Sequence, residues 1–190
     1  MLASSSVRIP FELLPPDARP FDVVGFGQNS LDLLAVVAEF PRSNSKQRIT
    51  RFARLPGGQV ASAMVCCARL GLRARYAGRF GTDELGQLGV RSLEEEGVDV
   101  SAVQIVDART RFAMVLVDER TGDRTVLWDR DPALAIRPGD IPDEVWTSGR
   151  VLHVDCEDVA ASTLAAQRAR ASGALTVIDV EAVLPGVPAL

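Results

Sequence analysis

Short apolar segments alternate with amphipathic or small-residue segments along most of the chain. Residues 21–27, Phe-Asp-Val-Val-Gly-Phe-Gly, form an apolar run that ends in glycine, which is typical of a buried strand leading into a functional turn. Residues 31–38 and 47–55 have extended character, and the turn-rich segment 41–45 separates them. We expect these two segments to form a hairpin outside the main sheet.

Two helices and one strand are predicted in the next part of the chain. Residues 59–70 carry apolar or small side chains on every side and are followed by Gly71, which predicts a helix buried on most of its surface. Residues 73–80 are predicted to form a strand. A second helix should begin at Thr82, because acidic side chains follow in its first turn and Gly97 lies just past its end.

The remaining segments complete an alternating order of strands and helices. Residues 110–117 and 124–128 are rich in β-branched and aromatic side chains and flank a Thr-Gly-Asp turn, which predicts a second hairpin. Residues 151–155 should form a buried strand, 159–171 a helix and 175–179 another strand. This order predicts an α/β fold whose mostly parallel sheet has helices on both faces. Ligands bind such sheets at the carboxyl ends of the strands.

Composition and charge exclude several classes of protein. The 190 residues are 47% hydrophobic and 24% charged, which is enough for one sizeable core. The formal net charge is -4, and interspersed acids and bases argue against a nucleic-acid partner. No stretch reaches the roughly 18 apolar residues that a membrane span needs, and the start lacks a signal-peptide pattern. We expect a cytoplasmic protein with a disordered leader at 1–20 and one domain at 21–190.

The cysteines and the histidine indicate no metal or nucleophilic site. Cys66, Cys67 and Cys156 form no Cys-x-x-Cys pair, and we expect all three thiols to be reduced and buried. His153 is the only histidine, and it lies inside an apolar strand with no nucleophile in a recognisable elbow nearby. We therefore assign His153 a structural role.

Three acidic residues lie where the predicted sheet should bind a ligand. Asp32 follows the first strand, and Asp155 and Asp179 end two later strands. A carboxylate accepts hydrogen bonds in pairs and so can bind vicinal hydroxyl groups. A turn or capping role explains any one of these residues equally well. Together they indicate a ligand site.

The glycine pair Gly57-Gly58 stands directly before the first predicted helix. Glycines let a ligand approach the backbone, and the free N–H groups of a helix start can bind oxygen atoms. A tight strand-to-helix turn is the alternative, and spacing alone favours it. The segment Gly25-Phe-Gly27 is no dinucleotide-binding motif, because Ser30 occupies the place of the third glycine.

Three segments resemble the amino-terminal part of the PfkB, or ribokinase-like, carbohydrate kinases. They are Val23-Val-Gly-Phe-Gly-Gln-Asn-Ser-Leu-Asp32, Pro56-Gly-Gly-Gln-Val-Ala-Ser-Ala63 with Ala68-Arg-Leu-Gly71, and Tyr76-Ala-Gly-Arg-Phe-Gly-Thr-Asp-Glu-Leu-Gly86. The last two together form the family's first signature, and the likeness runs in order from about residue 21 to 186. The resemblance implies a Rossmann-like, ribokinase-type fold with a small β-sheet lid, built from about 31–55 and 110–128.

Members of this family transfer the γ-phosphate of ATP to a sugar or nucleoside hydroxyl, so the resemblance implies ATP, Mg²⁺ and a small sugar substrate. It assigns hydroxyl binding to Asp32, Gly57 and Gly58. Many members carry an asparagine where this chain has Gln59 or Ser62, and these two residues and Asp155 complete the expected substrate-binding set. The resemblance is compatible with a homodimer formed through the lid.

Two motifs of the family have no match in these residues. They are the Mg²⁺-associated Asn-x-x-Glu motif and the Gly-Ala-Gly-Asp segment, which supplies the anion hole and the catalytic base. We therefore expect a truncated kinase sequence that holds no catalytic residue, does not phosphorylate sugars by itself and self-associates. Two alternatives stay open: a non-catalytic sugar-binding module, and a nucleoside kinase of the same superfamily.

Overall fold

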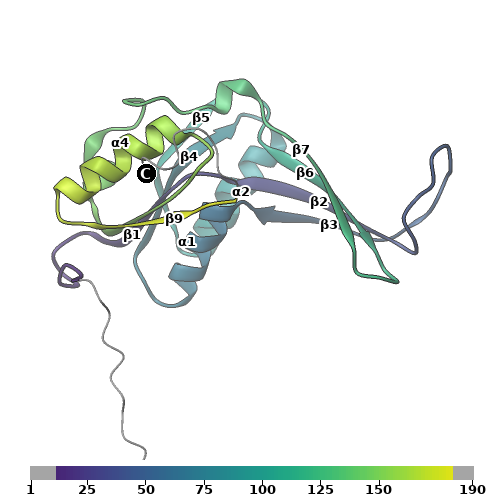
Figure 1. Ribbon diagram of the computed structural model, residues 1–190, viewed down its shortest axis with the longest axis horizontal. Coiled ribbons are helices and arrows are strands. Elements are labelled where there is room, and N and C mark those ends of the chain that lie inside the picture. The colour runs from purple at the N-terminus through teal and green to yellow at the C-terminus, as the bar shows by residue number, and fades with distance from the viewer. Residues whose placement is uncertain (1–11, 182–190) are drawn as a thin grey trace, which may run out of the picture.

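Two β-sheets organise the computed structural model, which describes residues 12–181. The larger one, sheet A, consists of β1 (Phe21–Phe26), β4 (Ala74–Gly81), β5 (Asp99–Val106), β8 (Gly149–Asp155) and β9 (Leu175–Asp179). Its strands are all parallel and lie in the order β5-β4-β1-β8-β9. Figure 1 shows a smaller sheet that projects away from the layered body containing sheet A.

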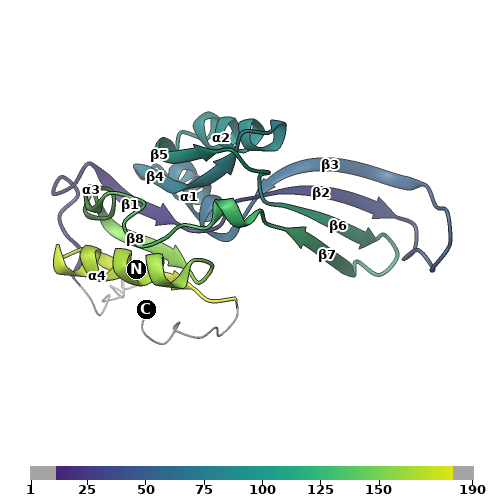
Figure 2. The same cartoon turned by 90° about the horizontal axis from the view of Figure 1, so that it is seen from above.

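Helices cover both faces of sheet A, as the alternating pattern predicted. In Figure 2, α1 (Gln59–Arg69) and α2 (Glu84–Glu95) lie on one side of the sheet, and α3 (Asp143–Thr147) and α4 (Val159–Ala171) lie on the other. Successive residues of β1 pack into different cores, because Val23 belongs to the cluster with α1 and Val24 to the cluster with α4. A strand buried on both faces needs the continuous apolar sequence that β1 has.

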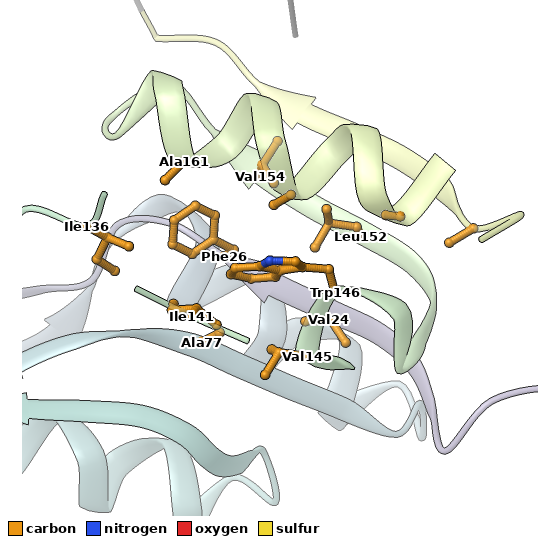
Figure 3. Close-up of a cluster of buried hydrophobic side chains, with 13 residues drawn as sticks. Val24, Phe26, Ala77, Ile136, Ile141, Val145, Trp146, Leu152, Val154 and Ala161 are labelled. Atoms are coloured by element: carbon orange, nitrogen blue, oxygen red, sulfur yellow. The ribbon is translucent and has the colours of Figure 1, made fainter. Parts of the chain in front are cut away.

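The core beside α4 combines a pair of aromatic rings with a stripe of small residues. The ring centroids of Phe26 and Trp146 lie 4.9 Å apart, and Figure 3 shows both rings between α4 and the sheet. Ala161, Ala165 and Ala169 recur every fourth residue on α4 and are all buried. Their small side chains let the helix pack closely against sheet A.

The smaller sheet, sheet B, has four strands in the order β3-β2-β6-β7. They are β2 (Ser30–Val37), β3 (Ile49–Gly57), β6 (Phe112–Asp118) and β7 (Arg124–Asp129). β2 pairs parallel with β6, and the two outer pairs are antiparallel. The predicted combination of a mostly parallel sheet with a small additional sheet is therefore confirmed.

Asp83 joins α2 to the entry of sheet B. Its Oδ1 accepts hydrogen bonds from the backbone N–H of Gly86 at 2.9 Å and from Thr110 Oγ1 at 2.6 Å. Its Oδ2 accepts one from the backbone N–H of Thr110 at 3.0 Å. The sequence placed the helix start at Thr82, whereas Asp83 is the N-cap and the helix begins at Glu84.

Some local expectations were wrong. The strand β5 and the short helix α3 were not predicted, because β5 is a half-buried edge strand and α3 spans five residues only. One side of α1 is open to solvent, including Ser62, Cys66 and Arg69, so this helix is less buried than its composition suggests. Cys66 is consequently exposed, Cys67 is half-buried, and only Cys156 has the predicted burial.

Part of the predicted leader is held against sheet A. Arg150 Nε donates a hydrogen bond of 2.6 Å to the carbonyl of Leu14, and Arg19 Nη2 donates one of 2.7 Å to the carbonyl of Ser172. Residues 12–20 are therefore anchored, while residues 1–11 lie outside the described part of the chain. Within residues 12–181, no helix is both long and apolar enough to cross a membrane.

Strand β9 forms one edge of sheet A and keeps one face open. Ile178 packs into the cluster with α4, whereas its neighbour Val177 points to the opposite face and is 44% exposed. Unpaired backbone groups beside an exposed apolar face favour association with another chain.

We predict that the purified 190-residue chain self-associates through this edge, so that its mass in light scattering rises with concentration. Val177→Lys should weaken the association, because it places a charge on the open face, whereas Glu94→Lys on the exposed side of α2 should not. A monomer that melts cooperatively at every concentration would show that this edge does not promote association.

Candidate functional site

A cleft of about 860 Å³ lies between the carboxyl-terminal side of sheet A and one face of sheet B. The residues after β1 and β8 contribute Gln28, Cys156 and Glu157 to its lining. Sheet B contributes one acidic residue, one basic residue, one hydroxyl-bearing residue and several apolar ones: Asp32, Arg124, Ser30, Leu34, Leu55, Ala113, Val115, Val126 and Trp128. The lining is completed by Gly58, Gln59, Arg111 and Glu181. The cleft therefore lies where the fold was predicted to bind a ligand.

Asp32 stands in β2 with its carboxylate beside the glycine pair. Ser30 Oγ donates a hydrogen bond of 2.9 Å to Asp32 Oδ1, which fixes the carboxylate and occupies one of its acceptor positions. A Cβ atom on Gly57 would lie only 3.0 Å from Asp32 Oδ2. The missing side chain at position 57 therefore leaves the second carboxylate oxygen open to a ligand.

Gly58 brings the start of α1 against the loop that follows β1. Its φ of 95° lies in the region that favours glycine, and a Cβ atom there would stand 2.4 Å from the Cα of Asn29. The backbone N–H of Ala61 donates a hydrogen bond of 3.2 Å to the carbonyl of Gln28 across this contact. The strand-to-helix turn that spacing favoured is thus real, and it opens towards the cleft through Gly58 and Gln59.

Asp155 lies beneath the cleft and does not line it, in contrast to the prediction that it contacts substrate. Its side chain is fully buried, and it accepts hydrogen bonds from the backbone N–H of Gln28 at 2.5 Å and of Glu157 at 3.0 Å. Burial raises the pKa of Asp155 to about 6. The structure therefore gives Asp155 the task of holding two cleft loops together.

Ser62 and Asp179 also lie away from the cleft. Ser62 lines a separate groove between α1 and α2, one helical turn beyond the glycine pair. Asp179 is paired in register with Asp155 at the end of β9 and is not part of the cleft lining. Burial lowers the pKa of His153, which lies in β8 and is not part of the cleft lining.

A network around Glu157 was missed by the sequence analysis. Arg111 Nη1 donates to Glu157 Oε2 at 2.9 Å, and its guanidinium lies 4.7 Å from the ring centroid of Trp128. Gln28 Nε2 donates to the same carboxylate oxygen at 2.7 Å, and Arg130 Nη1 approaches Glu157 Oε1 at 3.3 Å. This network ties the base of sheet B to the loops of sheet A. The only sequence signal was a second acid two residues after Asp155.

The charges of the cleft nearly cancel. Its lining contains Asp32, Glu157 and Glu181 against Arg111 and Arg124, which leaves one excess negative charge. Such a cleft has no strong attraction for an anion, and its carboxylate, amide and backbone groups suit a neutral polyhydroxylated ligand. Among residues 12–181, no group of three or more histidine, cysteine or acidic side chains could hold a metal ion.

The comparisons with known proteins agree with one another. A family model described as pfkB family carbohydrate kinase matches residues 21–181. Probable fructokinase-3 of Arabidopsis thaliana is 30% identical over 134 residues, and fructokinase-2 of Solanum habrochaites is 27% identical over 172 residues. These matches cover 69% and 86% of this chain, but only 37% and 51% of the respective relatives.

Solved structures show the same partial correspondence. A putative ribokinase from Agrobacterium tumefaciens superimposes with a TM-score of 0.78 and 27% identity, over 87% of this chain and 54% of that one. The ribokinase of Arabidopsis thaliana in complex with ribose and ATP has a TM-score of 0.74 at 19% identity, and the match covers 86% of this chain and 54% of that one. The fold is therefore ribokinase-like, and the chain spans about half the length of these structures.

The network around Glu157 generates a prediction about stability. Arg111→Met removes both the ion pair and the ring contact, and we expect it to lower the free energy of unfolding by about 1–3 kcal/mol. Arg109→Met is the control, because Arg109 is exposed and pairs with the exposed Asp129, and should change stability by less than about 0.5 kcal/mol. Urea titration measures both, and equal losses would contradict the assigned role of Arg111.

The buried carboxyl of Asp155 predicts a dependence of stability on pH. Because its pKa is raised in the folded state, the wild-type chain loses stability at this group as the pH rises from about 4 to about 6, by up to about 3 kcal/mol. Asp155→Asn has no ionisable group at this position and does not suffer this loss. From pH 4 to pH 7.5, the difference in unfolding free energy between the variant and wild type should therefore change in the variant's favour by that amount. The exposed Asp123→Asn should follow wild type. Parallel curves for Asp155→Asn and wild type would show that Asp155 ionises normally.

Proposed function

Because the chain belongs to the pfkB family of carbohydrate kinases, we propose that residues 1–190 form the sugar-binding part of an ATP-dependent carbohydrate kinase. The observation that carries this proposal is the carboxylate of Asp32, held in the cleft beside a side-chain-free turn. The chain is similar to enzymes named as fructokinases and ribokinases, which supports a sugar as the ligand. The excess of a single negative charge in the lining supports a neutral sugar.

Each of the cleft groups has a defined task in sugar binding. Asp32 accepts hydrogen bonds from two neighbouring hydroxyls, with Ser30 setting the orientation of the carboxylate. Gly57 and Gly58 let the sugar ring approach the backbone at the start of α1. Gln59, the first residue of α1, adds a side-chain amide that both donates and accepts hydrogen bonds.

Sheet B acts as the lid of this cleft. The face that it turns to the cleft is mostly apolar, with Leu34, Val115 and Trp128 among its side chains. An apolar cover over a bound sugar excludes water, which would otherwise compete with the sugar hydroxyl for the phosphoryl group. Leu55 and Trp128 remain 45% and 61% exposed, so the same face can also meet a second copy in a homodimer.

ATP and Mg²⁺ are proposed from family membership alone. Among the described residues, no set of side chains fits a metal ion, and the phosphate-binding and base-supplying motif has no match in the sequence. Residues 12–181 thus bind and orient the sugar and shield it from water, and no proton transfer is assigned to them. The free thiols of Cys66 and Cys67 support a reducing, cytoplasmic location.

Asp32→Asn tests the proposal. It should weaken the binding of the preferred sugar by about 1.5–3 kcal/mol, because it replaces hydrogen bonds to a charged group. Calorimetry of the 190-residue chain with fructose and ribose measures the effect, and circular dichroism confirms folding. Asp123→Asn in the exposed β6–β7 turn is the control and should bind as wild type does. An unchanged affinity in Asp32→Asn would remove Asp32 from the site, and the absence of sugar binding by wild type would overturn the proposal.

A further inference from the structure

A second concave site lies between α1 and α2, on the other side of the glycine turn from the sugar cleft. This groove has a volume of about 600 Å³, within the range of small-molecule sites. Its walls are mostly apolar and include Ala61 and Val65 of α1, Leu93 of α2 and Phe80 of β4. Asp32, Gly58 and Gln59, which are assigned to sugar binding, do not line it. Ser30 lines both sites, and Gly57, which lines the groove, stands against the carboxylate of Asp32 in the cleft.

Glycines on one helix and small side chains on the other create the groove. A Cβ atom on Gly89 would lie 2.4 Å from the ring of Phe80, so α2 rests closely on β4, and the buried ring forms part of the floor of the groove. On the facing side, Ala61, Ser62 and Cys66 are too small to reach across to α2. The groove is therefore a permanent feature of the packed backbone and does not depend on a mobile segment.

The charges at the mouth of the groove select the kind of ligand. Arg69 forms a two-point ion pair with Glu96, which bridges the ends of the two helices and neutralises both side chains. Glu95 also lines the mouth, and it has no hydrogen-bond or ion-pair partner among the described residues. The mouth thus carries one uncompensated negative charge next to an apolar interior.

We propose that this groove binds a small organic amine with an apolar ring, whose ammonium group pairs with Glu95 while the ring lies against Val65 and Leu70. An apolar body gains free energy by displacing water from these walls, and the carboxylate adds selectivity for a cation. An anionic molecule with the same ring gains the same free energy from the apolar walls, but the carboxylate of Glu95 repels it. The ligand class is therefore defined by ring and charge together.

A ligand bound in the groove should also change the affinity of the cleft for sugar. Ser30 lines the groove and donates its hydrogen bond to Asp32, and Gly57 stands against the same carboxylate. A ligand that presses on this shared wall changes the position of the sugar-binding carboxylate. This coupling rests on the proposed function, whereas binding in the groove does not.

The exposed thiol of Cys66 lines the groove and reports on its occupancy. Tryptamine serves as the probe and indole-3-acetate as its oppositely charged control, and the rate of iodoacetamide alkylation at Cys66 is followed by peptide mass spectrometry on the 190-residue chain. Tryptamine should slow alkylation at Cys66 and indole-3-acetate should not. Lack of protection by tryptamine, or equal protection by both compounds, would overturn the proposal.

Matched variants test whether the carboxylate of Glu95 pairs with the ammonium group of the ligand. Glu95→Gln should weaken the protection by tryptamine about fivefold, which corresponds to about 1 kcal/mol for an exposed ion pair. Glu94→Gln, one residue away and outside the groove lining, should leave it unchanged. Equal behaviour of the two variants would overturn the role of Glu95.

A blocking variant separates the site from the coupling. Ser92→Trp fills the groove and should abolish protection of Cys66, whereas Arg91→Trp on the neighbouring exposed position should preserve it. In the wild-type chain, saturating tryptamine should shift the calorimetric affinity for sugar. Protection of Cys66 without such a shift would overturn the coupling, and loss of sugar binding alone would overturn only the proposed function.

Discussion

The contact between the start of α1 and the loop after β1 determines the geometry of the whole site. Gly58 permits it, because any side chain there would collide with the backbone of Asn29. Ala61 donates to the carbonyl of Gln28 across the contact, and Asp155 holds the N–H of Gln28 from below. β2 begins on one side of this contact and β3 ends on the other. The contact therefore also determines the position of Asp32 relative to the glycine turn. A larger residue at position 58 would displace every one of these groups together.

Sheet B depends on a second set of links for its position over the cleft. Asp83 binds the backbone and hydroxyl of Thr110 at the entry to β6. The next residue, Arg111, joins Trp128 of sheet B to Glu157 in the loop after β8. Two adjacent residues therefore connect the sheet to two different parts of the core. Charged and hydrogen-bonded links of this kind can break and re-form without disturbing the apolar core, as the lid role proposed for sheet B requires.

The fold was largely readable from sequence because its signals are local. Apolar runs predicted β1, β8 and β9, and turn glycines and acidic first turns bounded the helices. The site was only partly readable. Asp32, the glycine pair and Gln59 lie together as expected. Asp155 and Asp179 also follow or end strands in the sequence, but they lie outside the cleft lining. Whether the end of a strand is covered by a surface loop depends on tertiary packing, which the local sequence does not show. Arg111 gave no signal at all, since its partner lies 46 residues away.

The charge balance of the cleft limits what the described residues can do. A neutral sugar, as proposed above for the ligand, requires no compensating cation in the cleft when its hydroxyls donate to a carboxylate such as that of Asp32. A nucleoside triphosphate carries several negative charges, and its transfer chemistry relies on concentrated positive charge and metal. Here Arg111 is committed to Glu157, and the lining keeps one excess negative charge. The described lining therefore suits a neutral hydroxylated ligand better than a polyphosphate, because it offers no concentration of positive charge.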